Sequence, residues 1–324
     1  MKKILITGAG GFIGSHLTEK CVELGYQVKV LLHYNSKNNW GWLEQSAVKK
    51  NIEVVTGDIR DYDSVSDAMK DCSEVFHLAA LIGIPYSYVS PLAYIKTNVE
   101  GTYNVLESAR KQQLENVIIT STSETYGTAQ YVPIDEKHPL VGQSPYSASK
   151  IGADQLAISY FRSFNLPVKI VRPFNTYGPR QSARAIIPTV ITQILDGKKT
   201  IKLGNITPTR DLTFVKDTAN GFIEISKAEK LNGTVTNIGM QEEIAVGDLV
   251  QLISELMEKN ILIETDSQRV RPDKSEVERL FCNNEKIKQT TKWKPDYTLK
   301  SGLLETINWF KEHHFSYKSD IYNY

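Results

Sequence analysis

Six short apolar runs alternate with stretches of helical pattern through the first half of the 324-residue chain. The runs cover residues 4–7, 28–32, 52–56, 75–78, 117–120 and 168–171. Crossover helices fit at residues 12–24, 63–70, 97–112 and 146–164. Because parallel strands need such crossovers, this alternation predicts a Rossmann-type α/β fold, with six parallel strands and helices on both faces. Ligands of such a doubly wound sheet bind at the carboxyl ends of the strands.

The alternation ends after Arg172 and Pro173, where proline and glycine become frequent and the strands become short. This change predicts a dinucleotide-binding domain over residues 1–173 and a smaller α/β substrate domain over 174–324. A segment near 211–240 is expected to return to the first domain. Helices are expected at 186–195, 246–257 and 303–313. The binding cleft is expected to lie between the two domains.

Composition excludes several classes of protein. Lys and Arg number 38 and Asp and Glu 37, a net charge of +1 that offers no bulk attraction for nucleic acid or an anionic membrane. The apolar run at 75–82 is far shorter than the roughly 20 residues of a membrane helix. The three cysteines are widely spaced, and His313-His314 has no ligand partner at useful spacing, so we expect no disulfide, no metal and a cytoplasmic location.

A glycine-rich turn directly follows the first strand and opens the first helix. Gly8, Gly11 and Gly14 leave room for a pyrophosphate to approach the backbone, and Phe12 and Ile13 begin the helix. The free N–H groups and the dipole of a helix N-terminus favour anions. Strand, glycines and helix together predict a dinucleotide site, although the spacing differs from the GxGxxG fingerprint.

Two later strands also end in segments suited to a cofactor. Asp58 and Ile59 follow the third strand, where the carboxylate can accept a hydrogen bond from an adenine amino group. Leu78, Ala79 and Ala80 end the fourth strand with small residues that let the backbone pass close to a ligand. Their shared position at strand ends predicts one binding edge.

The second strand ends without the carboxylate that binds the adenosine ribose in NAD enzymes. A 2′-phosphate would therefore meet no repulsion there. The side chains available to bind it include His33, Asn35 and Ser36. This composition favours NADP over NAD and leaves NAD open, with the ribose less tightly held.

Tyr146 and Lys150 stand four residues apart at the start of an expected helix, which places both on one face. A lysine ammonium can bind the nicotinamide ribose and lower the pKa of the tyrosine, which then acts as a general base. Ser121 and Thr122 end the preceding strand. The pattern predicts a redox centre.

Several motifs occur in one order along nearly the whole chain: TGAGGFIG, GDIRD, HLAA, NVEGT, STSETYG, YSASK and RPFNTYGPRQ. In this set the chain resembles the extended short-chain dehydrogenase/reductases that act on nucleotide sugars. Residues 34–43 and 142–150 look like the 4,6-dehydratases of legionaminic acid biosynthesis. The substrate implied by that resemblance is GDP-N-acetylglucosamine.

The residues beside the expected redox centre predict which reaction follows. Oxidation at C4 needs only Tyr146, Lys150 and a hydroxyl such as Thr122, and it makes the C5 proton acidic. Glu124 supplies the carboxylate that a dehydratase needs to remove that proton. Many 4,6-dehydratases carry an aspartate where this chain has Ser123, so the acid for the leaving C6 hydroxyl stays open, with Glu124 as one candidate.

Other functions fit parts of the same pattern. UDP-glucuronate decarboxylases share the STSE and YG residues, and a nucleotide-sugar 4-epimerase would need only the redox residues. A non-catalytic NADP-sensing protein would have no need for all of Thr122, Glu124, Tyr146 and Lys150. The dehydratase interpretation is therefore favoured, and the decarboxylase and epimerase stay open.

The resemblance also implies residues and contacts for the second region. Asn175, Arg180, Arg210 and Arg271 match family positions near the substrate phosphates, and arginine binds phosphate oxygens in a bidentate manner. The expected helices at 97–112 and 146–164 correspond to the four-helix interface of a homodimer.

Overall fold

Seven parallel strands form the central sheet of the computed structural model, which describes residues 2–270, 272–314 and 317. The strand order is β11-β6-β5-β4-β1-β2-β3. The bounds are β1 (Lys3–Thr7), β2 (Gln27–His33), β3 (Ile52–Gly57), β4 (Glu74–His77), β5 (Asn116–Thr120), β6 (Val168–Pro173) and β11 (Val235–Ile238). All six predicted strands are confirmed, and β11 adds a seventh.

The order of the strands reverses at β1, which pairs with β2 on one side and with β4 on the other. Lys3 is opposite Gln27, and Ile4 is opposite Glu74. This switch point leaves a crevice at the carboxyl ends of β1 and β4, where ligands of doubly wound sheets bind. The Rossmann-type fold class predicted from the sequence is confirmed.

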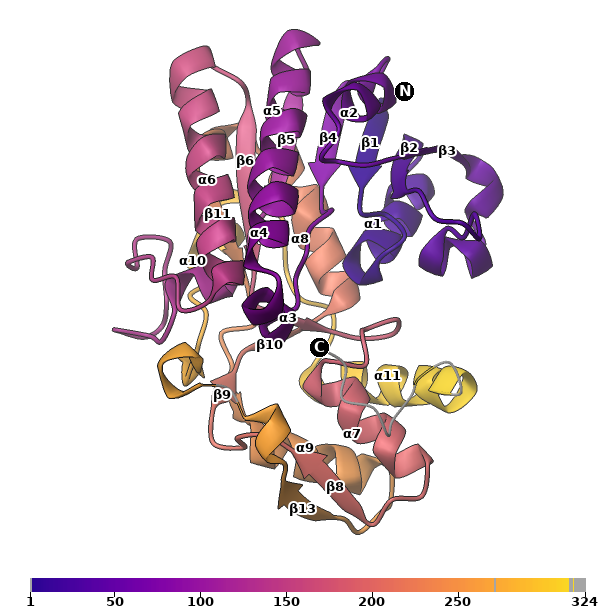
Figure 1. Cartoon of the computed structure of the whole chain (residues 1–324), viewed down its shortest axis with the longest axis vertical. Helices are drawn as coiled ribbons and strands as arrows, with labels where there is room; N and C mark the ends of the chain where they lie inside the picture. Colours follow the sequence, from indigo (N-terminus) through magenta and orange to yellow (C-terminus); the bar gives the residue numbers. More distant parts are fainter. Residues whose placement is uncertain (1, 271, 315–316, 318–324) are drawn as a thin grey trace.

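Helices cover both faces of the sheet (Figure 1). On one face α1 packs against α8, and on the other α2, α5 and α6 lie in a row. Their bounds are α1 (Phe12–Glu23), α2 (Tyr62–Met69), α5 (Gly101–Lys111), α6 (Pro145–Phe164) and α8 (Val215–Lys227). Each face has its own buried apolar cluster, because a parallel sheet in this position is apolar on both sides.

The start of α6 is set by its local sequence. Ser144 caps the helix by accepting from the backbone N–H of Ser147, whose hydroxyl bonds back to the N–H of Ser144, and Pro145 occupies the first helical position. The helix ends at Asn165, which has a left-handed conformation. This capping places Tyr146 in the first turn, facing the sheet end.

The connection between β4 and α5 contains helices that the sequence analysis missed. They are α3 (Ile84–Val89), α4 (Pro91–Tyr94) and a π-helical segment, η3 (Ile95–Glu100). The predicted helix at 97–112 is therefore two elements, η3 and α5. The segment 84–94 has prolines at the first helical turns, which sequence reasoning takes more readily as loops.

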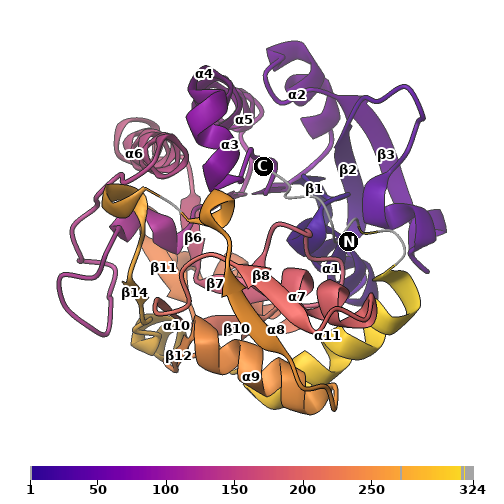
Figure 2. The same ribbon diagram turned by 60° about the horizontal axis from the view of Figure 1, so that its bottom comes forward.

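A smaller α/β part lies at the carboxyl end of the sheet. Figure 2 shows α7, α9 and α11 gathered on that side, where they share one apolar cluster. The helices are α7 (Ile186–Leu195), α9 (Val246–Leu256) and α11 (Leu299–His313). The short strands are β7 (Asn175–Tyr177), β8 (Thr200–Leu203), β9 (Thr209–Arg210), β10 (Leu212–Phe214), β12 (Ile244–Ala245), β13 (Leu262–Thr265) and β14 (Arg279–Leu280).

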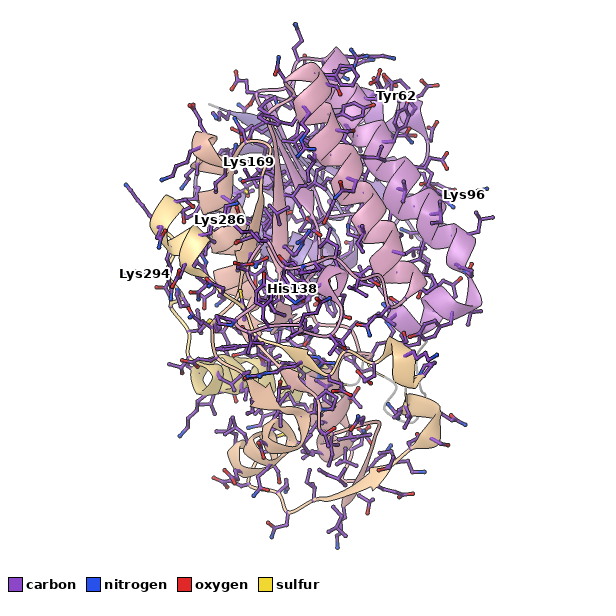
Figure 3. The ribbon with its side chains drawn as sticks, turned by 90° about the vertical axis from the view of Figure 1, so that its left-hand side faces the viewer. Tyr62, Lys96, His138, Lys169, Lys286 and Lys294 are labelled. Carbon is purple, nitrogen blue, oxygen red and sulfur yellow. The ribbon has the colours of Figure 1, made fainter. Side chains whose placement is uncertain are left out.

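The chain passes between the sheet part and the smaller part more than once. After β10 the chain enters α8 and then β11, which pairs in parallel with β6. The ammonium of Lys286 in α10 (Glu285–Thr290) donates to the carbonyl of Val235 in the edge strand β11 (Figure 3). The boundary at 173/174 stays a prediction. Within the described residues, no helix has the length and apolar character that crossing a bilayer requires.

Candidate active site

A cleft of about 1170 Å³ opens at the carboxyl ends of the strands. It is lined from the sheet side by the glycine turn and the ends of β2 to β5, and from the other side by β7, α7 and the loop before β9. All the catalytic candidates line this cleft. The cofactor-binding candidates line it except Ser36, and among the phosphate-binding candidates Asn175 and Arg210 line it. Arg271 lies outside the described residues.

The glycine turn packs so tightly that side chains would not fit at three of its positions, Gly8, Gly10 and Gly14. A Cβ on Gly8, which has a φ of +73°, would lie 2.6 Å from the backbone nitrogen of Ala79. A Cβ on Gly14 would lie 2.2 Å from the carbonyl oxygen of Gly8. Gly11 is the N-cap of α1 and offers no side-chain cap, so the N-terminal N–H groups of the helix stay available to an anion. This cradle fits the pyrophosphate of a dinucleotide.

Beyond the glycine turn, the loops after β2 and β3 line the far end of the cleft. The carboxylate of Asp58 accepts from Nε of Arg60 at 3.0 and 3.1 Å, and this contact lowers the pKa of Asp58. Nε2 of His33 lies 3.8 Å from Oδ2 of Asp58. Asn35 is engaged inside its own loop, where its amide donates to the carbonyl of Asn39 at 2.8 Å. Arg60 is a cleft residue that the sequence analysis did not single out.

Below the cleft, polar side chains fix the end of β4. His77 is buried between Thr7, whose hydroxyl lies 2.8 Å from Nδ1, and Thr102, whose hydroxyl lies 3.3 Å from Nε2. Burial lowers the pKa of His77 to about 3, so the ring is neutral. Asn98 accepts from the N–H of Leu81 and donates to its carbonyl, both at 2.9 Å. These contacts hold the 78–81 loop along the cofactor edge.

Tyr146 lies in the first turn of α6 and is only 7% exposed. Burial raises the pKa of its hydroxyl, a hydrogen bond with Thr122 lowers it, and the charge of Glu124 raises it. The pKa of Tyr146 is therefore raised overall. Loss of solvent outweighs the contact with Thr122 in the chain itself, and the lowering of this pKa by the Lys150 ammonium with a bound nicotinamide stays a prediction.

Lys150 lies one turn further along the same face of α6. Its Nζ donates to the carbonyl of Thr120 at the end of β5, at 2.5 Å. Burial lowers the pKa of Lys150 to about 8, and the charge of Asp154 opposes this effect. The four-residue spacing thus brings Tyr146 and Lys150 to one wall of the cleft, as the helix period requires.

Glu124 lies in a 3₁₀ turn, η4 (Ser123–Tyr126), that directly follows β5. Thr122 caps this turn by accepting from the N–H of Glu124 at 3.3 Å. The carboxylate is half-buried, lines the cleft and lies near enough to Tyr146 to raise its pKa. Within the described part of the chain it has neither an ion pair nor a hydrogen bond to its oxygens. A carboxylate is thus available for proton transfer beside the tyrosine. Ser123 is buried next to it.

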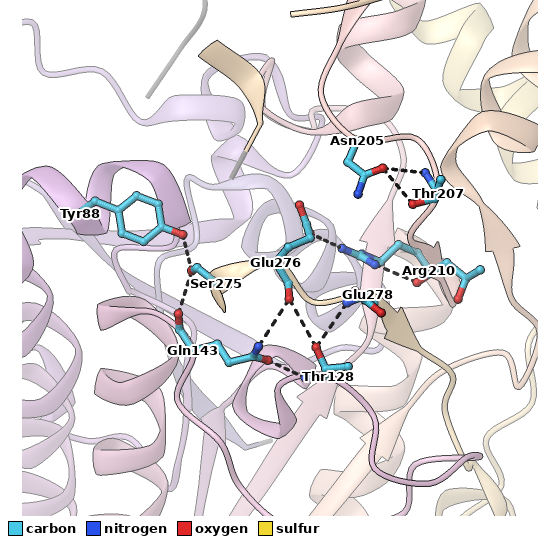
Figure 4. A network of polar contacts seen from close by, with 10 residues as sticks. Tyr88, Thr128, Gln143, Asn205, Thr207, Arg210, Ser275, Glu276 and Glu278 are labelled. Carbon is cyan, nitrogen blue, oxygen red and sulfur yellow. Dashed lines mark hydrogen bonds and ion pairs between the residues drawn. The ribbon is translucent and has the colours of Figure 1, made fainter. Parts of the chain in front are cut away.

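The candidates for phosphate binding separate into two groups. Asn175 lies in β7, and its buried Oδ1 has no hydrogen-bond partner among the described residues. Arg210 lies in β9, and its Nη2 is 3.3 Å from Oε1 of Glu276 (Figure 4). Arg180 instead turns toward α1, where its Nη2 donates to Oε1 of Glu19 at 2.8 Å. Arg180 does not line the cleft, because this ion pair holds its guanidinium against α1.

Other cleft residues had no sequence signal of their own. Arg184 and Arg269 line the cleft from loops of the C-terminal part, and Trp40 and Gly41 line it beside the glycine turn. Arginines on loops are usually surface charges, so nothing in the sequence distinguishes these two. Residues 39–43 have no role predicted from the sequence beyond the resemblance of residues 34–43. Their contact with the glycine turn is visible only in the structure.

Comparison with known proteins shows a family match over most of the chain. The family described as GDP-mannose 4,6 dehydratase matches residues 5–306. A UDP-N-acetyl-alpha-D-glucosaminuronate decarboxylase of Bacillus cytotoxicus is 32% identical over 322 residues, which is 96% of this chain and 98% of the relative.

Solved structures agree with this chain at similar identity. DesIV, a dTDP-glucose 4,6-dehydratase from Streptomyces venezuelae with NAD and TYD bound, has a TM-score of 0.87 at 28% identity and covers 98% of this chain and 99% of its own. UDP-glucuronic acid 4-epimerase from Bacillus cereus, in complex with UDP-glucuronic acid and NAD, has a TM-score of 0.86 at 27% identity, covering 96% and 99%. The similar proteins therefore include dehydratase, decarboxylase and epimerase activities.

Proposed function

Because this chain belongs to the GDP-mannose 4,6-dehydratase family of nucleotide-sugar enzymes, we propose that it converts GDP-N-acetylglucosamine to the 4-keto-6-deoxy derivative. The observation that carries the dehydratase assignment is the Glu124 carboxylate beside Tyr146 in the cleft. Simple C4 redox chemistry needs only the tyrosine, the lysine and a hydroxyl such as that of Thr122. An acid-base group next to them is needed when a proton must also leave C5. The guanine base, the N-acetyl group and a place in legionaminic acid biosynthesis come from the resemblance of residues 34–43 and 142–150.

The residues of the chain divide the proposed reaction between them. Tyr146 removes the proton of the C4 hydroxyl, and Thr122 holds the tyrosine hydroxyl through their hydrogen bond. Glu124 then takes the C5 proton, and water leaves as a proton is supplied to the C6 hydroxyl. With Ser123 in place of the more common aspartate, Glu124 is the proposed donor of that proton as well. Asn175 and Arg210 bind the diphosphate.

A nicotinamide dinucleotide, when bound, supplies the hydride acceptor at C4 and the hydride donor at C6. The N-terminal N–H groups of α1 beyond Gly11 would hold its pyrophosphate, and Asp58 its adenine. Lys150 would bind the nicotinamide ribose. We propose NADP over NAD, because His33 and Arg60 stand at the end of the cleft near the second strand and no carboxylate ends that strand. The opposing charge at this position is the carboxylate of Asp58, which is paired with Arg60 and lies 3.8 Å from Nε2 of His33.

Titration with each dinucleotide tests the cofactor preference. We expect the wild-type chain to bind NADP more tightly than NAD. His33→Asp adds a carboxylate at the end of β2 and should reverse that order, while leaving the melting temperature nearly unchanged because His33 is exposed. Tighter binding of NAD to the wild-type chain would contradict the NADP proposal and leave the dehydratase proposal standing.

A panel of nucleotide sugars tests the reaction. Incubation with GDP-N-acetylglucosamine should give a product that has lost one water, measured by mass spectrometry. The same panel with UDP-N-acetylglucosamine, UDP-glucose and UDP-glucuronate separates the alternatives, because a decarboxylase releases CO2 and an epimerase changes no mass. The decarboxylase is the second candidate, since a relative of that activity matches nearly the whole chain. Release of CO2 without loss of water would replace the present proposal.

A homodimer formed through α5 and α6 is also proposed. These helices lie side by side along one flank (Figure 1). Tyr103 and Phe164 on them are exposed, as are Leu92 and Ile95 just before α5. Exposed apolar groups on adjacent elements are typical of an interface. A monomer by light scattering at micromolar concentration would refute it. The cytoplasmic location stays a prediction from the cysteine pattern.

A further inference from the structure

Three charged side chains are buried together beneath Tyr146. Lys150, Asp154 and Arg172 are 3%, 0% and 1% exposed. Oδ2 of Asp154 accepts from Nη2 of Arg172 and from the hydroxyl of Ser121, both at 2.6 Å. Asp154 follows Lys150 by four residues on α6, so both lie on one face of the helix. A single buried carboxylate is therefore paired with a buried guanidinium and lies one helical turn from a buried lysine on which its charge acts.

The second oxygen of Asp154 has no hydrogen-bond partner among the described residues, although it is buried. A buried carboxylate oxygen without a partner is costly, because it has lost its solvation. Nζ of Lys150 donates to the carbonyl of Thr120, 2.5 Å away, and among the described residues it makes no hydrogen bond to Asp154. The interaction between the two is electrostatic, and the low polarity of the surroundings strengthens it. Burial lowers the pKa of Lys150 to about 8, while Asp154 acts to raise it.

Other charged and titratable groups face this region from several elements. Tyr146 lies on the same helix, His77 at the end of β4, Arg172 on β6 and Glu124 on η4. His77 is neutral, since burial and the charge of Lys150 lower its pKa to about 3. Arg172 lies 4.6 Å from the ring centroid of Tyr126 and is paired to the same carboxylate.

We propose that Asp154 is a positioning residue that keeps Lys150 in its ammonium form inside the buried site. The ammonium then supports Tyr146 as the base, a step that rests on the proposed function. Without the carboxylate, burial would be the main influence on the protonation of Lys150, and burial favours the neutral amine. The alternative role for Asp154 is structural, as a counter-charge for Arg172 only.

Titration of Lys150 in the intact protein separates the two roles without any substrate. The chain is labelled with ¹³C at the lysine Cε, and Lys150→Ala assigns the Lys150 signal by its loss. In Asp154→Asn the midpoint should fall by about one pH unit or more, a tenfold change in the ratio of ammonium to amine. Asp154→Glu, which keeps the charge, should restore a midpoint near that of the wild-type chain.

Two further variants control for unfolding and for the pair with Arg172. Asp217→Asn makes the same chemical change at a buried carboxylate on α8 that accepts from backbone N–H groups, and it should lower stability without moving the Lys150 midpoint. Asp154→Asn combined with Arg172→Gln removes the unpaired guanidinium and so preserves the fold. Its Lys150 midpoint should stay below that of the wild-type chain. A wild-type midpoint in this double variant, or in Asp154→Asn itself, overturns the proposal.

The pH dependence of sugar oxidation tests the catalytic consequence of this role in a separate experiment. In Asp154→Asn the alkaline limb of the pH profile for sugar oxidation should move to lower pH in parallel with the Lys150 midpoint, and Asp154→Glu should reverse the move. If the midpoint shifts but no nucleotide sugar is converted even by the wild-type chain, the proposed function fails and the role of Asp154 stands. If sugar is converted but the midpoint does not shift, the role of Asp154 fails alone.

Discussion

Trp42 and Trp309 meet edge to face, with ring centroids 5.3 Å apart and an interplanar angle of 77°. Trp42 belongs to the segment after β2, and its backbone N–H donates to the carbonyl of Gly10 at 3.0 Å. Trp309 belongs to α11, where its ring also stacks on His313 at 4.3 Å. One aromatic contact therefore joins the glycine turn to the last helix.

Breaking this contact should weaken both the fold and the dinucleotide site. In a double-mutant cycle of Trp42→Leu and Trp309→Leu, we expect a coupling of about 0.5 to 1.5 kcal/mol in the free energy of unfolding, as for other aromatic pairs. Trp42→Leu should also reduce dinucleotide affinity, because the ring contact with Trp309 anchors the segment whose backbone N–H at residue 42 donates to the carbonyl of Gly10. Urea denaturation and dinucleotide titration measure the two effects. Strictly additive single effects would show that the rings do not interact.

Two glycines of the turn should respond differently to substitution. Gly11 has an ordinary extended conformation, and its Cβ position meets only the carbonyl of Gly8, at 3.2 Å. Gly11→Val should therefore fold with a loss of about 1 kcal/mol as a poorer N-cap, yet lose dinucleotide binding because the side chain fills the phosphate cradle. Gly14→Ala should destabilise the fold itself, since its Cβ would lie 2.2 Å from backbone. Thermal denaturation and dinucleotide titration separate the outcomes, and tight binding by Gly11→Val would refute the cradle.

The central sheet could be predicted because its evidence is local. Each of β1 to β6 is a short apolar run bounded by turn residues, and parallel pairing buries both faces. By contrast, β11 is a run of four residues that joins the sheet only through its pairing with β6, far from it in the chain. A segment near 211–240 was expected to return to the first domain, but the helix α8 within it was not predicted, because it follows β10 in the C-terminal part and packs against α1 only in the folded chain.

In the site, too, the features set by local sequence could be predicted, and those set by contacts between distant elements could not. Tyr146 and Lys150 are placed by one helix period, and Glu124 follows a strand end, so local sequence predicts that they line one cleft. The pairing of Asp154 with Arg172 joins α6 to β6, and Arg180 pairs with Glu19 from a distant helix. Such contacts depend on how elements pack together, so they cannot be predicted from the spacing of residues in the sequence.

A buried lysine outside the site should make stability depend on pH in a definite direction. Lys169 of β6 is buried, its Nζ donates to Oδ1 of Asn116 at 2.6 Å, and burial lowers its pKa to about 8 (Figure 3). The unfolded chain holds this proton up to a pKa near 10.4. Between these values the unfolded state binds more protons, so the free energy of unfolding rises with pH through this window.

Lys169→Met should lack that contribution. We expect the free energy of unfolding of the wild-type chain, measured relative to that of the variant, to rise from pH 8 to 10. The expected rise is about 1 kcal/mol after allowance for solvent screening. Urea denaturation at several pH values measures it. Lys294→Met, at an exposed lysine, is the control and should show no such trend. A flat difference for Lys169→Met would mean that Lys169 keeps an ordinary pKa.

Tyr146 and Glu124 should fail at different steps of the proposed reaction. Tyr146→Phe removes the base for the C4 hydroxyl and should stop all conversion. Glu124→Gln keeps shape and hydrogen bonding but loses the carboxylate, so the sugar is still oxidised at C4 while product formation falls about 10²-fold or more. Rapid mixing would follow C4 oxidation by near-ultraviolet absorbance, and mass spectrometry would follow water loss. Normal turnover by Glu124→Gln would assign the C5 proton to another group.

Solvent exchange at C5 gives an independent test of elimination. The proton that Glu124 removes from C5 passes to a group that exchanges with solvent or leaves with the C6 hydroxyl, so C5 must later receive a new proton. Turnover of the wild-type chain in heavy water should therefore place one deuterium at C5 of the 4-keto-6-deoxy product, detected by NMR as loss of the C5 proton signal. Product incubated in heavy water without enzyme controls for spontaneous exchange beside the ketone. A product formed without deuterium at C5 would exclude removal of the C5 proton, and a C4 redox or epimerase role would replace the dehydratase.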